Sequence, residues 1–294
     1  MARIAIVGPG AIGGTVAGCL SRSRRHDVFL CARRVIPNLT IETAAGVSEI
    51  RPIVWTNPRD AEPVDWVLVA TKAYDVEATA AWFPRLRGSR APVAVLQNGV
   101  EHRERFAAHV PPAEIVPVVV RTSAERPEPT LIRQRTPVRL TVGTDGHGPA
   151  FCELFAGTGA EITPTADFRS AAWAKLCLNA AGVLSALVLR PAEVMHDEPI
   201  AEAARAIVRE CIAVGRAEGA MLPDDLPETV VRSYRGQPPD SVNSLHADCL
   251  AHRPTEIDAR NGVVVRLGRS QGIPTPCNEL AVALLNARTR PSRT

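Results

Sequence analysis

Lysine is nearly absent from this sequence. Of its 34 basic residues, 32 are arginine and only two are lysine, Lys72 and Lys175. Positions that need positive charge alone have therefore been filled by arginine, which does not release its proton in proteins. A lysine can lose its proton when its surroundings lower its pKa. Lys175 in particular is thus a candidate for chemistry that arginine cannot perform.

A strong net charge and paired cysteines are missing too. The net charge is +3, which is too small to indicate a nucleic acid or an anionic membrane, so we expect a small-molecule partner. Seven cysteines without a Cys-X-X-Cys pair do not form a disulfide framework, and they predict a cytoplasmic protein. Successive spacings of three place His246, Cys249 and His252 on diverging sides of a helix, so no metal site is expected.

Long apolar runs are the last absence. No run approaches the ~18 residues of a membrane span, and Gly and Pro interrupt the apolar N-terminal stretch too early for a signal peptide. We therefore expect no membrane partner. The length of 294 residues exceeds what one core usually serves and favours two domains.

The first half of the chain alternates strand-like and helix-like stretches, which is typical of a parallel sheet with helices on both faces. Residues 121–138, rich in Arg, Pro and Thr, are expected to form an irregular hairpin. Strands are predicted over 3–7, 28–31, 66–70, 93–96, 115–120 and 139–142, and helices over 12–23, 76–83 and 101–108.

Strand-like patterns end near residue 164. The sequence therefore predicts an α/β protein, with an N-terminal Rossmann-type parallel-sheet domain over residues 1–166 and an all-helical domain over residues 167–294. Helices of the second domain are predicted over 167–189, 200–218, 226–234, 243–251, 256–271 and 278–288.

A glycine-rich turn joins the first predicted strand to the first helix. Gly8 permits the tight turn, Gly10 lets a pyrophosphate approach the backbone, and Gly13 lets the helix pack on the strand. The helix N-terminus supplies N–H donors for the phosphates, so we predict a dinucleotide site here; the alternative is a turn without a ligand. The motif consists of Gly8, Pro9, Gly10, Ala11, Ile12 and Gly13.

The residues after the second strand distinguish NAD from NADP. An NAD enzyme places Asp or Glu there for the ribose hydroxyl, whereas this chain continues VFLCARR. Arg33 and Arg34 suit a 2′-phosphate by charge and geometry, which predicts NADPH/NADP+ with Arg33 as a contact. Whether Arg33 or Arg34 reads the phosphate stays open, and a solvated arginine pair is the alternative.

Polar residues follow two further predicted strands. Lys72 comes after the strand at 66–70, and Asn98 comes after the strand at 93–96. Ligands of open parallel sheets bind at the carboxyl ends of strands, so both residues are candidates for cofactor or substrate binding. The alternatives are a surface lysine and an Asn-Gly turn.

Lys175 lies in the apolar helical stretch AAWAKLCLNAAG. At helical spacing Lys175, Asn179 and Val183 share one face. A buried lysine and a mid-helix asparagine are costly unless they face a polar cleft, and a desolvated lysine can serve as a general acid. The alternative is an exposed lysine on the helix flank.

Two late polar residues stand near predicted helix starts. Ser244 lies in NSLHAD, and Glu256 follows Thr255, a possible cap. Glu256 either favours the helix dipole or faces the cleft and orients the cofactor or Lys175.

Together these segments resemble the ketopantoate reductase (2-dehydropantoate 2-reductase) family over nearly the whole chain. That family reduces a 2-oxo acid with NADPH on the way to pantothenate. The resemblance implies that Lys175 is the general acid, with Glu256 a catalytic or cofactor contact in the closed cleft. It implies further contacts to substrate from Asn98, Asn179 and Ser244, and to cofactor from Arg33, Lys72 and Asn98. The matching segments are GPGAIG at 8–13, TKAYD at 71–75, LQNGVE at 96–101, WAKLCLNA at 173–180, NSLHAD at 243–248 and RPTEIDARNG at 253–262.

One residue departs from the family pattern. The family usually has a second Asn four residues after the first, where this chain has Val183. A paralogous NADP-dependent reductase of another 2-oxo acid is therefore an alternative, and a non-catalytic NADP(H)-binding redox sensor is another. A monomer or a homodimer is expected.

Overall fold

The computed structural model describes residues 1–88 and 90–289. The chain forms two compact units, here called the sheet unit and the helical unit. The sheet unit comprises Met1–Gln97 and Glu101–Phe168, whereas the helical unit comprises Asn98–Val100 and the chain from Arg169 onward. The boundary predicted at 166/167 did not anticipate that Asn98–Val100, which comes shortly after a strand, belongs with the helices.

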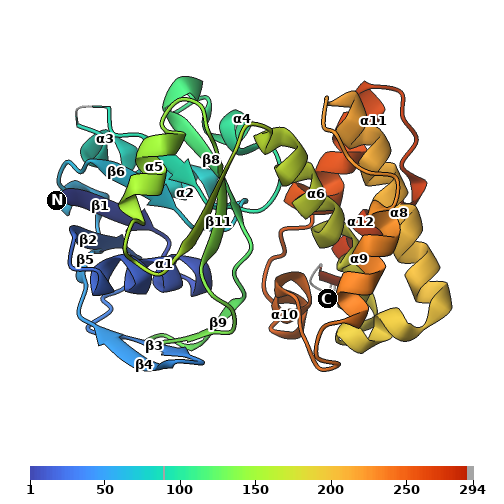
Figure 1. Ribbon diagram of the computed structural model, residues 1–294, viewed down its shortest axis with the longest axis horizontal. Helices are drawn as coiled ribbons and strands as arrows, with labels where there is room; N and C mark the ends of the chain where they lie inside the picture. The colour runs from blue at the N-terminus through green and yellow to red at the C-terminus, as the bar shows by residue number, and fades with distance from the viewer. Residues whose placement is uncertain (89, 290–294) are drawn as a thin grey trace, which may run out of the picture. The chain divides into compact units, whose positions relative to one another are not determined.

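The sheet unit is built on an eight-stranded sheet in the order β12-β11-β8-β7-β6-β1-β2-β5 (Figure 1). Its strand pairs are parallel except β8 with β11, which is antiparallel. The exception arises because a hairpin segment, rather than a crossover helix, connects these two strands. The strands are β1 (Ala2–Val7), β2 (His26–Cys31), β5 (Ile53–Trp55), β6 (Trp66–Val69), β7 (Val93–Val95), β8 (Ile115–Val120), β11 (Arg139–Gly143) and β12 (Glu161–Thr165).

Helices cover both faces of this sheet, as the sequence predicted. In β1, Ile4 and Ile6 face the cluster formed by α1 and α5, while Ala5 and Val7 face the cluster formed by α2, α3 and α4. This two-sided burial explains the near-continuous apolar strand sequences. The helices are α1 (Ala11–Arg22), α2 (Val76–Ala80), α3 (Phe83–Leu86), α4 (His102–Phe106) and α5 (Gly148–Leu154), with short 3-10 turns at Pro58–Asp60 and Pro112–Glu114.

A second, four-stranded sheet in the order β4-β3-β10-β9 packs against α1. The hairpin predicted within 121–138 forms β9 and β10, but β3 and β4 were not predicted. Gly14 and Gly18 allow the close packing, because a Cβ atom on either would lie under 3 Å from Ile132 or Ile41. The strands are β3 (Leu39–Thr43), β4 (Gly46–Ile50), β9 (Ala124–Glu128) and β10 (Leu131–Gln134).

The helical unit surrounds one apolar cluster. Val100 packs against this cluster, in agreement with the assignment of Asn98–Val100 to the helical unit. The helices are α6 (Phe168–Ala181), α7 (Val183–Val188), α8 (Glu198–Ala217), α9 (Leu226–Arg235), α10 (Ser244–Leu250), α11 (Val263–Ser270) and α12 (Pro276–Thr289), with a 3-10 turn η3 (Ala192–His196) and a π-helical turn η4 (Asp258–Gly262).

The segment Phe168–Val188 is long and apolar enough to span a membrane by length and composition, with a mean hydropathy of 1.5. The expectation that no stretch would meet this criterion was therefore wrong. More than half of the segment is buried inside the protein, where Trp173, Leu176 and Cys177 join the core of the helical unit. The core helix of a soluble protein meets the same criterion, so the segment is weak evidence for a membrane.

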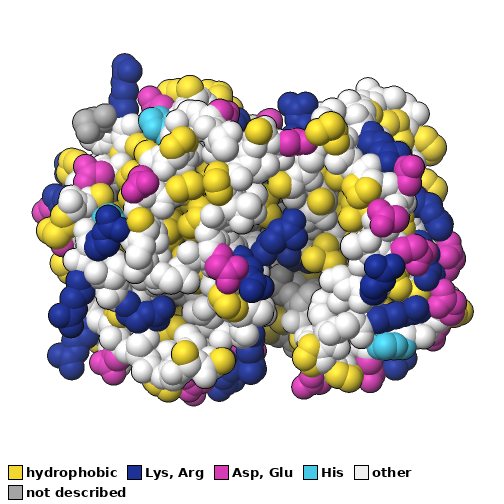
Figure 2. All heavy atoms as spheres, viewed as in Figure 1, with side chains coloured by type: hydrophobic (Ala, Val, Ile, Leu, Met, Phe, Trp, Pro, Cys, Tyr) yellow, Lys and Arg dark blue, Asp and Glu magenta, His cyan; other side chains and the backbone are white. Residues whose placement is uncertain are grey.

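Arginines on the surface form many ion pairs. Arg133 contacts Glu42 and Glu125, and Arg139 contacts Glu161. On the face drawn in Figure 2, basic and acidic side chains are interspersed over both units. In these pairs the arginine contributes a positive charge to an ion pair and needs no other chemistry.

Candidate active site

The turn from β1 to α1 forms a cradle at the carboxyl edge of the large sheet. Gly8 has a positive φ of 86°, and its N–H donates to the Cys31 carbonyl at the end of β2 (3.1 Å). A Cβ atom on Gly8 or Gly13 would collide with neighbouring backbone, whereas one on Gly10 would meet nothing within 4 Å. Gly8 and Gly13 thus serve the fold, and Gly10 faces space that a ligand can fill.

The start of α1 is suited to an anion. Gly10 is the N-cap and offers no side-chain hydrogen bond, and no acidic residue occupies the first turn. The first N–H groups of the helix therefore lack a capping side chain, and they retain the positive end of the helix dipole. This arrangement fits the pyrophosphate of a dinucleotide.

Four parallel strands end side by side at this edge. Val7 pairs with Cys31 and Val69, and Val69 pairs with Val95. The register aligns the glycine turn with the residues that follow the other three strands. Arg33 and Lys72 follow β2 and β6, so both predicted cofactor residues lie at the same edge as Gly10.

Gln97 fixes the ends of β6 and β7 to one another. Its Nε2 donates to Thr71 Oγ1 (3.0 Å) and to the Lys72 carbonyl (3.1 Å), and the side chain is buried. Gln97 was not among the predicted site residues, although it lies beside Asn98 in the motif LQNGVE. Lys72 itself is half-buried.

The guanidinium groups of Arg33 and Arg34 are exposed just beyond β2. Elsewhere, exposed arginines such as Arg133 and Arg135 engage carboxylates. Within residues 1–88 and 90–289, neither Arg33 nor Arg34 has an ion-pair or hydrogen-bond partner. Their charge is therefore available to a phosphate.

Three predicted site residues from distant parts of the chain meet in the helical unit. Asn179 Nδ2 donates to Asn98 Oδ1 (3.2 Å), and Asn98 Nδ2 donates to Glu256 Oε2 (3.1 Å). Asn179 is 9% exposed and Glu256 is 5% exposed. The carboxylate thus orients the Asn98 amide, which in turn orients the Asn179 amide.

Glu256 does not lie in the first turn of an α-helix, as one alternative required. The segment before Ile257 has no regular secondary structure, and the π-helical turn η4 begins at Asp258. This turn is closed by a hydrogen bond from Gly262 N to the Ile257 carbonyl (3.0 Å). Thr255 is therefore not a helix cap, a correction to the sequence prediction. Glu256 is instead buried and hydrogen-bonded to Asn98.

Lys175 lies on α6, one helical turn before Asn179. It is half-buried, while the next two residues, Leu176 and Cys177, are buried in the core. Residues at this spacing occupy the same side of a helix. Lys175 therefore lies on the same side of α6 as Asn179, which is hydrogen-bonded to Asn98. Val183, one turn after Asn179, is fully buried in the apolar core.

Three side chains from other elements bind the carbonyl groups at the end of α6. Tyr234 Oη donates to the Leu178 carbonyl (3.0 Å), Asn261 Nδ2 to the Ala180 carbonyl (3.2 Å) and Asn243 Nδ2 to the Gly182 carbonyl (3.0 Å). These bonds hold the backbone on both sides of Asn179. None of the three donors was predicted from the sequence, because their function depends on which helices pack together.

Ser244 is the first residue of α10 and is exposed. Asn243 caps this helix, since its side chain accepts from His246 N (3.0 Å). The Ser244 hydroxyl accepts a hydrogen bond from Arg260 Nη2 (2.8 Å). Arg260 is a buried residue of η4 and was not among the predicted site residues.

The spaced residues His246, Cys249 and His252 lie in different environments. The first two are buried, whereas His252 is exposed beyond the end of α10 with a positive φ of 51°. Burial also lowers the pKa of His246. Among the residues that the structure describes, no group of three His, Cys, Asp or Glu side chains could hold a metal ion.

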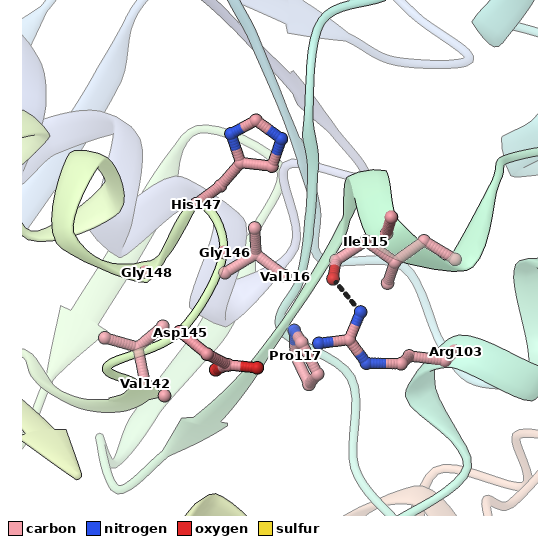
Figure 3. A pocket seen from close by; sticks show the side chains of 11 residues that line it. Arg103, Ile115, Val116, Pro117, Val142, Asp145, Gly146, His147 and Gly148 are labelled. Carbon is pink, nitrogen blue, oxygen red and sulfur yellow. Dashed lines mark hydrogen bonds between the residues drawn. The ribbon is translucent and has the colours of Figure 1, made fainter. Parts of the chain in front are cut away.

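A small pocket lies in the sheet unit between the start of β8 and the end of β11 (Figure 3). It is lined in part by Arg103, Asp145 and His147, and Arg103 donates to the Ile115 carbonyl (2.7 Å). Its volume of about 20 Å³ suits a single water molecule. The parallel register of β7 and β8 places it at the amino edge of the sheet, opposite the glycine turn.

Known proteins match this chain over nearly its full length. The family model "Ketopantoate reductase PanE/ApbA" matches residues 4–146, and its C-terminal counterpart matches residues 167–289. A 2-dehydropantoate 2-reductase from Caulobacter vibrioides is 49% identical over 287 residues, covering 98% of this chain and 99% of that protein.

Solved structures share the fold. A PanE/ApbA family ketopantoate reductase from Ralstonia eutropha has a TM-score of 0.89 and 32% identity, covering 98% of each chain. D-mandelate dehydrogenase, in a ternary structure with NADH and anilino(oxo)acetate, has a TM-score of 0.88 and 21% identity, again covering 98% of each chain. The latter likeness is one of fold.

Proposed function

This chain belongs to the ketopantoate reductase family, and on that premise we propose that it reduces 2-dehydropantoate (ketopantoate) to pantoate with NADPH, Lys175 acting as the general acid. The observation that carries the proposal is the hydrogen-bonded series Asn179–Asn98–Glu256, one helical turn from Lys175. The balanced reaction consumes one NADPH and one proton and yields pantoate and NADP+.

The residues at the sheet edge fit the cofactor. Gly10 leaves open space beside an uncapped helix start, which would hold the pyrophosphate, and Arg33 or Arg34 would hold the 2′-phosphate. Lys72 follows β6 at the same edge and would be a further contact. When bound, NADPH supplies the hydride for C2 of the substrate.

The chain's own residues would stabilise the negative charge that develops on the substrate and supply the proton. Negative charge develops on the C2 oxygen of the substrate, where the Lys175 ammonium stabilises it and then donates its proton to that oxygen. Asn98 and Asn179 would hold the substrate by their amides, whose orientation Glu256 fixes. An arginine at position 175 could supply the charge but not the proton.

The first test is an assay of the wild-type protein with ketopantoate and NADPH, followed at the nicotinamide absorbance band, with NADH in parallel. We expect fast oxidation of NADPH and slow oxidation of NADH. Tight NADPH binding without turnover on any 2-oxo acid would contradict the enzymatic function and favour a redox sensor.

A reductase of another 2-oxo acid is the second candidate, favoured by Val183. That side chain is fully buried and apolar, so it cannot provide the amide that the family usually carries there. A panel of 2-oxo acids of different size separates the candidates: ketopantoate should give the highest kcat/KM, and a higher value for another acid would identify a different substrate.

Replacing Arg33 by serine tests the choice of cofactor. We expect KM for NADPH to rise at least ~10-fold in Arg33→Ser, because one charged hydrogen bond to phosphate contributes about 1.5–3 kcal/mol. KM for NADH, which lacks the 2′-phosphate, should change little. Arg34→Ser is the matched control, and it shows which of the two arginines contacts the 2′-phosphate. If either substitution raised KM for NADPH and KM for NADH equally, a 2′-phosphate contact at that position would be contradicted.

A further inference from the structure

Arg260 is a buried cation without an acidic partner. It is 3% exposed, and within residues 1–88 and 90–289 no carboxylate lies at ion-pairing distance from it. Arg205, which is 8% exposed, shows the usual solution, because it pairs with Glu198, Glu202 and Glu228. A buried charge is costly unless it is paired, so an anion from outside the described chain would stabilise Arg260.

The guanidinium of Arg260 retains unused donors. Nη2 donates to Ser244 Oγ (2.8 Å), while Nε is buried without a hydrogen-bond partner. Nη1 has no partner among the described residues either, but unlike Nε it is not sealed from solvent. The Ser244 oxygen accepts a hydrogen bond from Arg260, and Ser244 is exposed. Its hydroxyl group can therefore still donate a hydrogen bond to a ligand. Nη1–H and the Ser244 hydroxyl are thus two neighbouring donors for one anion.

The pair is carried by elements bonded to the helix of Lys175. Asn261, next to Arg260, donates to the Ala180 carbonyl, and Asn243, next to Ser244, donates to the Gly182 carbonyl. These carbonyls lie one and three residues beyond Asn179. The two donors are therefore tied to the same end of α6 as the proposed substrate amide.

Tyr234 is not the missing counter-ion. Burial raises its pKa to about 12, although the charge of Arg260 acts in the opposite direction. The phenol is therefore neutral near pH 7, and it donates its proton to the Leu178 carbonyl (3.0 Å). Val183, on the same helix end, has no polar atom in its side chain. A bound anionic ligand would supply the negative charge that these side chains do not.

We propose that Arg260 and Ser244 bind the carboxylate of the 2-oxo acid, so that Arg260 replaces the amide contact that Val183 cannot make. A carboxylate oxygen accepts from Nη1–H of Arg260 and from the Ser244 hydroxyl, and it neutralises the buried guanidinium. This inference rests on the proposed function for the identity of the acid. The requirement for a carboxylate does not depend on which 2-oxo acid is reduced.

The test compares Arg260→Met and Arg260→Lys with the control Arg269→Met, which removes an exposed arginine paired with Glu279. In Arg260→Met we expect KM for ketopantoate to rise at least ~10-fold, because the variant loses one charged hydrogen bond to the substrate. KM for NADPH should be unchanged. Arg260→Lys should recover part of the loss. The melting temperature of Arg260→Met should be no lower than that of the wild type, because the variant removes an unpaired buried charge.

Binding of oxamate, a small carboxylate resembling a 2-oxo acid, separates this inference from the proposed function. If the wild type does not reduce ketopantoate, the proposed function fails, yet oxamate should still bind the NADPH-loaded wild type and not Arg260→Met in calorimetry. Equal oxamate binding by both proteins, or by neither, overturns the role of Arg260. So does a lowered melting temperature with KM for ketopantoate unchanged, which indicates a structural role.

Discussion

Lys175→Ala is expected to lower kcat by at least ~10², the range found when a general acid is removed. The methyl group can neither stabilise the developing charge on the C2 oxygen nor donate a proton to it. Because Lys175 is half-buried rather than part of the apolar core, the variant should fold normally. The measurement is kcat with saturating ketopantoate and NADPH, together with the melting temperature.

Lys175→Arg is the matched control, and it separates charge from proton transfer. Arginine keeps the positive charge but does not release a proton near neutral pH, so this variant should be nearly as slow as Lys175→Ala. Near-normal turnover in the alanine variant would remove the proposed role of Lys175. Recovery by arginine alone would reduce that role to electrostatic stabilisation.

Gly13→Ala is expected to destabilise the protein, whereas Gly10→Ala should impair only cofactor binding. A Cβ atom at Gly13 would collide with the Gly8 carbonyl oxygen and lie 3.1 Å from Ala70 Cβ. Overpacking of this kind costs about 1–3 kcal/mol, and each kcal/mol lowers the melting temperature by about 2–4 °C in a domain of this size. The decrease should be visible in thermal unfolding without any ligand.

Gly10 supplies the control within the same turn. A Cβ atom there meets nothing within 4 Å, and Gly10 has a φ of −73° that alanine adopts readily. The melting temperature should therefore not fall, while KM for NADPH should rise at least ~10-fold because the methyl group occupies the space for the pyrophosphate. An unchanged KM would contradict the cofactor site. A stable Gly13→Ala variant would show that the helix can shift away from β1.

Much of the sheet unit was predictable because its determinants are local. Strands buried on both faces read as continuous apolar runs, and the turn at Gly8 and Gly13 needs glycine for reasons of backbone geometry and close packing. The strands β3, β4, β5 and β12 were not predicted. They are short and half-exposed, and the pattern of such strands acquires meaning only from the partner that pairs with them.

The sequence by itself determined which residue types are available for the proposed site. The scarcity of lysine singled out Lys175, and helical spacing placed Asn179 beside it. Only the tertiary structure decided that Asn98, three residues after the end of β7, joins the helical unit and links Asn179 to Glu256. Such contacts join residues 81 and 158 positions apart, and no local pattern records them.

Arg260 illustrates the same limit most clearly. In a chain with 32 arginines, its sequence surroundings do not distinguish it from the arginines that form surface ion pairs. The fold buries it without a carboxylate, while it gives Arg205 three. Sequence thus specifies which groups are available, whereas burial and pairing, which set the free energy of a charge, depend on the packing of segments that are remote along the chain.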